Sequence, residues 1–294
     1  MGADRARLLN GLVTCDVAAL APGRGAQGFF TDIKGHVLAE MVVLVGDDSL
    51  WLRIDRSVVE SIASHIERYI LADRVEVRAH LEQAAVTLLG PEANARATDL
   101  LGVETEALRT WSHRLIEVGT EPVRVMADGH YGIPAITLAA SVAAIEQITR
   151  SLRASAAAES PIEIRQEIVD TIRIEEGVPA FGCDYDTDNL PQETGIESAI
   201  DYDKGCYLGQ EVVARLHYRG QVARRVTRLR GEGKHLPEVG SPLVLDNREG
   251  GTLTSVARRP GGDQISALAV LQRRCWEPGT RLVLADGETM RVVS

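Results

Sequence analysis

Residues 203 to 215 read Asp-Lys-Gly-Cys-Tyr-Leu-Gly-Gln-Glu-Val-Val-Ala-Arg, the stretch of this chain that is densest in chemically distinctive residues. Gly205 and Gly209 allow tight turns or a close approach of the backbone to a ligand. Gln210 and Glu211 suit the first turn of a helix, and the valines that follow suit its apolar side. The pattern therefore predicts that Cys206 lies just ahead of a helix N-terminus.

Cys206 is the candidate catalytic side chain, with Lys204 as the cation beside it. A nearby cation and a helix N-terminus both favour the reactive thiolate form of a cysteine. Two interpretations stay open from these residues alone: a nucleophilic or redox thiol, and a small side chain that only packs. His217 lies eleven residues further on and nothing orients it toward Cys206, so no covalent catalytic dyad is predicted.

Length and composition restrict the class of protein. A chain of 294 residues suits two or three domains of about 100 to 200 residues each. The net charge of -10 argues against wholesale binding to nucleic acid or a membrane surface. The four cysteines are dispersed, which excludes a disulfide scaffold or a zinc ribbon, and we expect no metal site. No signal-like segment and no apolar run of about 18 residues occurs, so we expect a cytoplasmic protein.

Hydrophobic periodicity predicts an alternation of strands and helices followed by an all-β region. Residues 35–45 and 49–54 suit a hairpin, and Ser57 with Glu60 forms a capping-box pattern ahead of an amphipathic helix. The pattern from 75 to 153 is that of a split βαβ arrangement, with strands at 75–80, 84–89, 114–118 and 122–126 and helices at 92–101 and 141–153. Residues 154–160 suit a linker or a frayed helix end, and Pro161 suits the start of a helix that ends near Thr171. Short alternating strands follow from Arg224 onward and indicate a small all-β C-terminal domain.

A segment rich in carboxylates, glycines and prolines runs from Arg173 to Gly195. Glu175 and Glu193 are its candidate ligand-binding residues, because a carboxylate held on a turn can accept paired N–H bonds from a flat 2-amino-4-oxo heterocycle. The alternative is a solvated acidic loop.

Arginines recur between Arg215 and Arg230, interleaved with His217 and Tyr218. Such a patch suits the clamping of a polyanionic tail or contacts with RNA phosphates. The alternative is the solvated face of a half-exposed strand.

Six motifs resemble those of the YgfZ-type folate-binding proteins, which are relatives of the glycine-cleavage T-protein. The first of them is Lys204-Gly-Cys-Tyr-Leu-Gly-Gln-Glu211 followed by Arg215. The others are Leu9 to Asp16 with Phe29 to Leu38 in the N-terminal region, and Arg173 to Pro179, Leu190 to Gly195 and Arg219 to Arg225 in the centre.

The resemblance implies an α+β, T-protein-like ring of three domains, two ferredoxin-like and one a C-terminal β-barrel, around a central folate site. The implied boundaries are residues 1–45 with 160–222, residues 46–159 and residues 223–294. It also implies tetrahydrofolate or a one-carbon derivative as cofactor. Glu175 and Glu193 would bind its pterin and Arg224 or Arg225 its glutamyl carboxylate, and Gln210 is a further cofactor-binding candidate.

The implied function is that of a folate-binding accessory protein that supports the assembly or repair of iron–sulfur proteins, with Cys206 as its functional thiol. Its partners would be reduced folate, iron–sulfur client or assembly proteins, and in a further alternative RNA linked to tRNA modification. A folate-dependent aminomethyl or methyl transferase is the enzymatic alternative. True aminomethyltransferases carry an acidic pair where this chain has Ala39 and Glu40, so we do not expect that activity.

Overall fold

The computed structural model describes residues 1–105, 108–154, 162–259 and 261–293. The chain folds as two compact units: a first unit of residues 1–28 and 41–164, and a second unit of residues 29–40 and 165–294. Strands β1 (Gly25–Thr31) and β2 (Val37–Val45) belong in part to both units. The tip of this hairpin, residues 29–40, is thus separated in sequence from the rest of its unit. The three-domain division implied by the resemblance stays a prediction.

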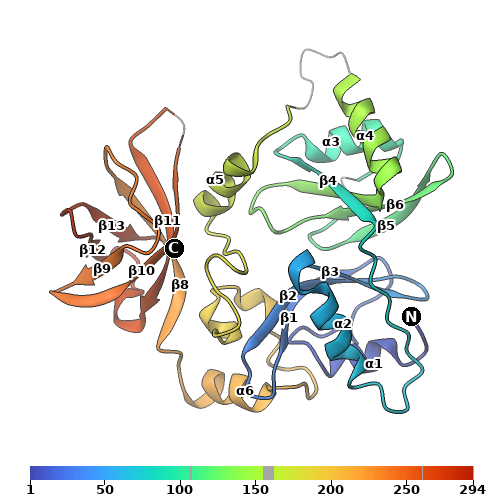
Figure 1. Cartoon of the computed structure of the whole chain (residues 1–294), viewed down its shortest axis with the longest axis horizontal. Coiled ribbons are helices and arrows are strands. Elements are labelled where there is room, and N and C mark those ends of the chain that lie inside the picture. The colour runs from blue at the N-terminus through green and yellow to red at the C-terminus, as the bar shows by residue number, and fades with distance from the viewer. Residues whose placement is uncertain (106–107, 155–161, 260, 294) are drawn as a thin grey trace. The chain divides into compact units, whose positions relative to one another are not determined.

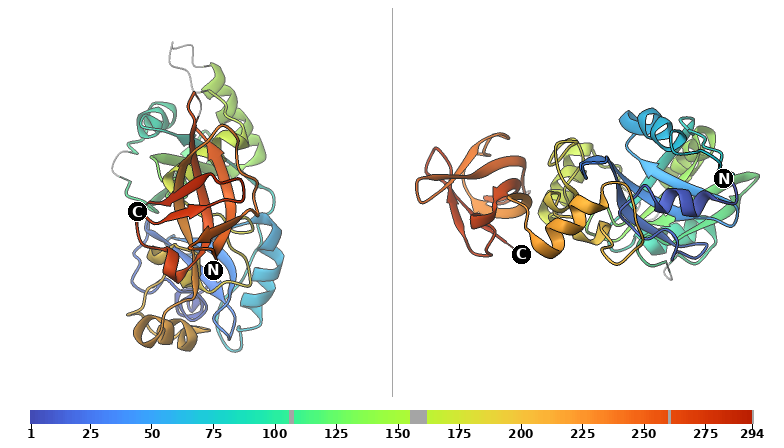
Figure 2. Two further views of the ribbon diagram at one scale, coloured as in Figure 1. Left: turned by 90° about the vertical axis from the view of Figure 1, so that its left-hand side faces the viewer. Right: turned by 90° about the horizontal axis from the view of Figure 1, so that it is seen from below.

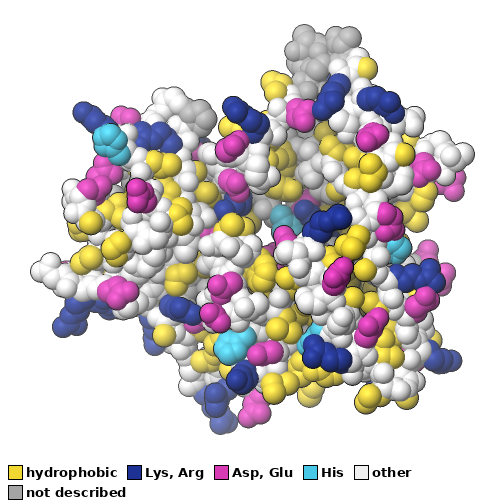
Figure 3. Space-filling model, in the orientation of Figure 1, with side chains coloured by type: hydrophobic (Ala, Val, Ile, Leu, Met, Phe, Trp, Pro, Cys, Tyr) yellow, Lys and Arg dark blue, Asp and Glu magenta, His cyan; other side chains and the backbone are white. Residues whose placement is uncertain are grey.

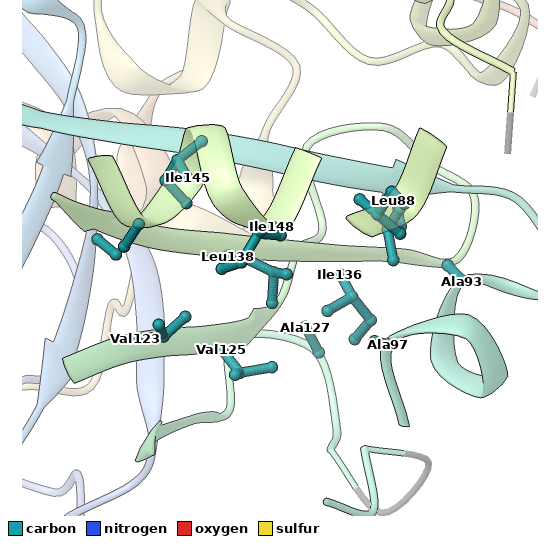
Figure 4. Packing of buried hydrophobic residues seen from close by; sticks show 13 residues of the cluster. Leu88, Ala93, Ala97, Val123, Val125, Ala127, Ile136, Leu138, Ile145 and Ile148 are labelled. Atoms are coloured by element: carbon teal, nitrogen blue, oxygen red, sulfur yellow. The ribbon is translucent and has the colours of Figure 1, made fainter. Parts of the chain in front are cut away.

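The first unit contains a four-stranded antiparallel sheet with the strand order β4-β7-β6-β5. These strands are β4 (Gln83–Leu89), β5 (His113–Val118), β6 (Glu121–Ala127) and β7 (Ala135–Ser141). Two helices, α3 (Ala93–Leu101) and α4 (Val142–Ala154), pack on one face of the sheet, and Figure 4 shows Ile145 and Ile148 of α4 over Val123 and Val125 of β6. Because strand side chains alternate between faces, this apolar spacing on β6 and β7 fixes which side the helices cover.

The other helices and the other strand of the first unit are labelled in Figure 1: α1 (Arg5–Asn10), α2 (Val59–Glu67) and β3 (Leu50–Ile54), which pairs antiparallel with β2. A 3-10 turn at Arg56–Val58 precedes α2. The helix α2 buries Ile62 and Ile66 on its apolar face, as the periodicity predicts.

A buried carboxylate, Asp128, joins β3 to the four-stranded sheet. It pairs with Arg53 of β3 and accepts hydrogen bonds from Thr137 Oγ1 at 2.7 Å and from the backbone N–H of His130 at 3.0 Å. The ring of His130 lies 2.8 Å from the same carboxylate. Burial by itself would raise the pKa of Asp128, but the bond from His130 and the charge of Arg53 outweigh it and hold this pKa below its usual range.

The second unit contains a closed six-stranded barrel with the strand order β10-β11-β8-β13-β12-β9, seen in orange to red in both views of Figure 2. Its strands are β8 (Arg224–Glu232), β9 (Pro242–Leu245), β10 (Arg248–Arg258), β11 (Gln264–Gln272), β12 (Arg281–Val283) and β13 (Thr289–Val292). Closure leaves no unpaired strand edge. The all-β C-terminal region predicted from the sequence is confirmed.

Two helices and two 3-10 turns complete the second unit: α5 (Gln166–Glu176), α6 (Gln210–Arg219), Pro191–Glu193 and Glu197–Ala199, with a further 3-10 turn at Arg273–Cys275 in the barrel. A core separate from the barrel interior holds them together, and it includes Phe29, Val37, Ile174, Tyr185 and Val213. The α+β fold class is confirmed.

Several local predictions were wrong. Residues 75–80 form no strand, and the strand β7 was missed because Pro134 and Gly132 flank a run that is nearly all apolar. The Ser57–Glu60 capping box does not form. Asp55 instead accepts the Ser57 N–H at 2.8 Å and starts a 3-10 turn before α2.

The helix predicted from Pro161 to Thr171 is displaced along the chain. The structure has α5 at Gln166–Glu176, ended by Gly177 with φ +77°, a conformation that glycine adopts without strain. Pro161 and the predicted linker at 154–160, apart from Ala154 at the end of α4, lie outside the described residues.

Candidate functional site

All the site residues predicted from the sequence lie in the second unit. A cavity of about 510 Å³ opens in the same unit between the loop 182–189 and the barrel strands β10 and β11. Its charged lining residues are Asp184, Asp186, Asp188, Glu249 and Arg224. The cavity is therefore polar, and Arg224 supplies its positive charge.

Glu193 is buried beside this cavity, with 8 % of its surface exposed. Its Oε2 accepts hydrogen bonds from Asn189 Nδ2 at 3.0 Å and from the N–H of Leu190 at 3.2 Å, while Oε1 lies 3.4 Å from Arg224 Nε. Pro191 at the first position of the 3-10 turn fixes the local backbone. The sequence-predicted pair Glu193 and Arg224 is thus brought into contact, and the carboxylate is held in one orientation.

The two candidate arginines point to different surroundings, as adjacent strand residues do. Arg224 lines the cavity and also reaches the Asp188 carbonyl at 3.5 Å. The guanidinium of Arg225 lies 4.5 Å from the centroid of the Trp276 ring, a cation–π distance.

Glu175 has a partner of its own. Its two carboxylate oxygens lie 3.1 and 3.4 Å from the guanidinium of Arg259. Glu175 does not belong to the described residues that line the cavity. The structure therefore brings Glu193 and Arg224 together without bringing Glu175 to them.

Cys206 lies in a loop that precedes α6, as predicted, and its side chain is exposed and not in a disulfide. The loop is closed by Asp201 Oδ1, which accepts the N–H groups of Asp203 and Lys204, both at 2.9 Å. Lys204 itself is buried, with its ammonium 5.2 Å from the centroid of the Tyr207 ring. Gln210 donates from Nε2 to the Lys204 carbonyl at 3.4 Å, so these two side chains help to shape the loop that presents the thiol.

The two glycines of this loop have different structural roles. Gly209 has φ +81°, and a Cβ there would lie 2.4 Å from the Asp32 carbonyl oxygen and 2.8 Å from Gly35 Cα. A Cβ added at Gly205 would meet no described atom within 4 Å. Only Gly209 is therefore required by the packing of the loop against the β1–β2 turn.

Replacing Gly209 with alanine should lower the free energy of unfolding by roughly 1 to 3 kcal/mol, because the new Cβ adds backbone strain and a backbone clash. Gly205→Ala is the matched control and should change stability by less than about 1 kcal/mol. Urea denaturation of the two variants measures the difference, and equal stabilities would contradict the role given to Gly209.

Sequence reasoning missed Tyr185, which lines the cavity and is buried. Its hydroxyl donates a hydrogen bond to Glu40. Burial and the neighbouring Glu40 carboxylate raise the pKa of Tyr185 well above its usual value, so the phenol stays protonated as a donor. Ala39, the other residue at the position of the acidic pair, is fully buried.

Asp184 was also missed. It accepts hydrogen bonds from Arg173 Nη1 at 2.8 Å, from Thr254 Oγ1 at 2.6 Å and from the Ala180 N–H at 2.9 Å. These bonds tie α5 and the loop 182–189 to the barrel strand β10. The sequence offers a carboxylate-rich segment as the only signal, and it does not reveal which carboxylate faces Arg173.

The arginines between Arg215 and Arg230 are divided between α6 and β8. On α6, His217 stacks on Tyr202 with 3.6 Å between ring centroids, and Tyr218 is exposed. On the face of the molecule in Figure 3, Lys and Arg side chains lie among Asp and Glu side chains.

Metal-binding groups and membrane-spanning helices are both absent from the described residues. No group of three or more His, Cys, Asp or Glu side chains there is placed to hold a metal ion. Within the same ranges, none of the helices has the length and apolar character needed to cross a membrane.

Comparison with known proteins identifies the class. Residues 1–204 match the model of the GCVT N-terminal domain family, and the chain belongs to this glycine-cleavage T-protein family. Within it, the chain is similar to the tRNA-modifying protein YgfZ of Serratia proteamaculans, with 26% identity over 269 residues, which are 89% of this chain and 77% of the relative. The YgfZ of Yersinia enterocolitica is 25% identical over 276 residues, 91% of this chain and 79% of that protein. The resemblance to YgfZ-type members inferred from the motifs is confirmed.

A solved structure confirms the fold. The glycine cleavage system aminomethyltransferase T from Bartonella henselae superposes with a TM-score of 0.89 at 17% sequence identity, covering 100% of this chain and 81% of that one. The T-protein-like α+β fold with a C-terminal barrel is thus confirmed.

Proposed function

We propose that this protein binds a reduced folate, tetrahydrofolate or a one-carbon derivative, and supports the assembly or repair of iron–sulfur proteins with the thiol of Cys206. The observation that carries the proposal is the buried Glu193 carboxylate, oriented by two donors and in contact with Arg224 beside a polar cavity. Membership of the T-protein family supports folate as the ligand.

The residues present fit this ligand chemically. A pterin edge offers paired N–H donors, and Glu193 supplies an oriented acceptor for them. Arg224 lies 3.4 Å from Glu193 and would therefore be at the pterin end, where it can pair with the Glu193 carboxylate. The glutamyl tail extends from the opposite end of the folate, and Arg225 is the remaining candidate to bind its carboxylate. Glu175 remains a candidate for a second pterin contact, since a carboxylate paired with Arg259 keeps free lone pairs. Bound folate would supply a carrier for one-carbon units.

Cys206 and its loop are the candidate reactive element. The side chain is exposed at the surface, held by a loop that Lys204 and Gln210 support. A single cysteine can supply only one of the ligands of an iron–sulfur cluster, so any cluster contact needs further thiols from a partner protein or a small molecule. We propose the cytoplasm as the location, where thiols stay reduced.

The names of the relatives favour a link to tRNA modification. We propose that the supported proteins include enzymes that modify tRNA. Direct RNA binding through Arg215 to Arg230 is the less favoured form of this link, because the net charge is -10 and opposite charges are interspersed on the face seen in Figure 3. Aminomethyl transfer is also less favoured, because Ala39 carries no acid and the Glu40 carboxylate already accepts the Tyr185 hydroxyl.

The test replaces Cys206 with alanine in a strain that lacks the chromosomal gene. We expect tetrahydrofolate affinity in calorimetry to stay within about twofold of wild type, since the thiol is not among the residues proposed to hold the folate. We expect the activity of iron–sulfur enzymes and the level of modified tRNA to fall to those of the deletion strain.

Cys275→Ala is the cysteine control, because Cys275 lies in the barrel core of the same unit and is not among the described residues that line the cavity. It should complement the deletion fully. Full complementation by Cys206→Ala would refute the role of the thiol, and absence of tetrahydrofolate binding by the wild-type protein would refute the folate site.

A further inference from the structure

The first unit contains a second cavity, of about 450 Å³, that the proposed function does not use. Its walls come from β3, α2, the segment 75–85 and the strands β6 and β7. Its apolar lining includes Leu44, Trp51, Ile62, Ile66 and Met126. The volume lies within the range of about 300 to 1,000 Å³ typical of small-ligand sites.

The four-stranded sheet forms the floor of this cavity and leaves space beside the cationic side chain of Arg124. Arg124 and Met126 of β6 line the cavity on the face opposite the helix-covered one. Arg124 is paired across the sheet with Ala139 of β7, which in turn pairs with Ala85 of β4. Both of these residues are alanines that line the cavity, so no long side chain covers Arg124 from β7 or β4. On the other side its cross-strand partner is Leu115 of β5.

Arg124 is half-buried and its contacts are with neutral groups. Its Nη1 donates to His113 Nδ1 at 2.9 Å, and its guanidinium carbon lies 4.5 Å from the centroid of the Trp51 ring. His113 Nε2 lies 3.0 Å from the Val45 carbonyl, which can only accept, so Nε2 carries the proton and Nδ1 is the acceptor.

The His113 ring does not add a charge at neutral pH. Burial and the neighbouring Arg124 lower the pKa of His113 to about 4. Burial lowers the pKa of Arg124 to about 10, so this guanidinium is still charged at pH 7. No ion pair with a carboxylate is formed by Arg124 among the residues that the structure describes. A cation held out of water without a counter-ion is unfavourable.

The other arginines of the lining are already engaged. Arg53 is paired with the buried Asp128 and Arg78 with Glu76. Arg56 donates to the Leu81 carbonyl at 3.1 Å, and Arg5 donates to the Gly2 carbonyl at 3.0 Å. Among the described lining residues, five are arginines and one, Glu76, carries a carboxylate. This positive balance, in a chain of net charge -10, makes the cavity complementary to an anion.

We propose that this cavity is a second ligand site, distinct from the folate site, that binds a small organic anion with an apolar aromatic or aliphatic body. The acid group pairs with Arg124, and the body lies against Trp51 and the apolar residues of α2. The site occurs wholly within the first unit, whereas the proposed folate contacts lie in the second.

The experiment uses the full chain and the dye 8-anilinonaphthalene-1-sulfonate, an apolar anion whose fluorescence rises on transfer from water. We expect saturable binding of one dye per chain. 1-Naphthoate should displace the dye at a concentration at least about tenfold lower than its neutral counterpart 1-naphthylmethanol, because only the acid forms a charge-assisted bond with Arg124. Equal displacement by the two compounds would overturn the proposal without the use of any variant.

Two variants and one control locate the site. Arg124→Met should weaken naphthoate binding by about tenfold or more, and Ala139→Leu, which fills the cavity but keeps the charge, should weaken both dye and naphthoate. Arg114→Met is the matched control, since Arg114 is exposed on the neighbouring strand β5 and does not line the cavity, and it should bind as wild type does. Wild-type affinity in either test variant would refute the site.

Further measurements distinguish a loss of binding from a loss of folding, and distinguish this cavity from the folate site. Near-ultraviolet circular dichroism reports whether Arg124→Met folds. If it does not fold, the binding of dye by Ala139→Leu and the comparison of 1-naphthoate with 1-naphthylmethanol still test whether the cavity binds an anion. Saturating tetrahydrofolate should leave the dye bound, and its displacement by folate would overturn the assignment of a separate site. The dye result does not depend on whether folate binds at all.

Discussion

Replacing Glu193 with glutamine should weaken tetrahydrofolate binding by about tenfold to a hundredfold, as expected for the loss of about 1.5 to 3 kcal/mol of charge-assisted hydrogen bonding. The Glu193 carboxylate is oriented by the Asn189 amide and the Leu190 N–H and contacts Arg224. A glutamine there has the wrong charge and must turn its NH₂ group toward existing donors or toward the ligand. Isothermal calorimetry with tetrahydrofolate measures the loss.

Glu197→Gln is the matched control for that experiment. Glu197 lies in the next 3-10 turn and is exposed, and its replacement removes the same charge from the same segment. We expect its tetrahydrofolate affinity to equal that of wild type within about twofold. If Glu193→Gln bound as tightly as this control, the carboxylate would have no part in holding the pterin.

Replacing Asp128 with asparagine should lower the free energy of unfolding by about 1 to 3 kcal/mol, because the buried carboxylate loses its charge-assisted hydrogen bonds while its partner Arg53, 37 % exposed, can still be hydrated. Asparagine cannot neutralise Arg53 and leaves the hydrogen bonds of His130 and Thr137 poorly matched. Urea denaturation at pH 7 measures the change. Asp99→Asn, at an exposed position of α3, is the control and should lie within about 0.5 kcal/mol of wild type.

The stability that the Asp128 carboxylate contributes to the wild-type protein depends on pH. The pKa of Asp128 is lower in the folded protein than its usual value, which is about 3.9 in unfolded chains. The stability it contributes is therefore fully present above about pH 4 and is lost as the pH falls toward the lower folded pKa. Below pH 4 the wild-type protein should lose stability more steeply than Asp128→Asn. Parallel curves would show that the ionised carboxylate does not stabilise the fold.

Much of the fold could be predicted from the sequence, because the spacing of apolar residues indicates most of its helices and strands. The hairpin β2–β3, the helices α3, α4 and α6, and the all-β C-terminal region follow from local apolar spacing and turn residues. The errors have local physical causes. Asp55, not Ser57, accepts the hydrogen bond that starts the 3-10 turn before α2. The strand β7 is too uniformly apolar to show the period-two pattern of a half-buried strand.

The site was predictable only in part. Motifs named Glu193, Arg224 and Cys206 as candidates, because their residue types and order are specific, and the structure brings the first two into contact. The contacts of Tyr185 with Glu40 and of Asp184 with Thr254 join residues 145 and 70 positions apart, and no local pattern encodes such pairs. The buried location of Lys204 also could not be foreseen, since nothing in its neighbours specifies that its ammonium lies on Tyr207.

The hairpin tip 29–40 has a consequence for how the chain folds during its synthesis. Phe29 packs edge-on against Tyr185, with 6.1 Å between ring centroids, and the Val37 N–H bonds to the Asn189 carbonyl at 2.9 Å. These partners are translated only after residues 41–164, which belong to the other unit. The growing chain must therefore carry an apolar tip without its partners while the first unit forms, and a contact of such sequence separation is slow to close.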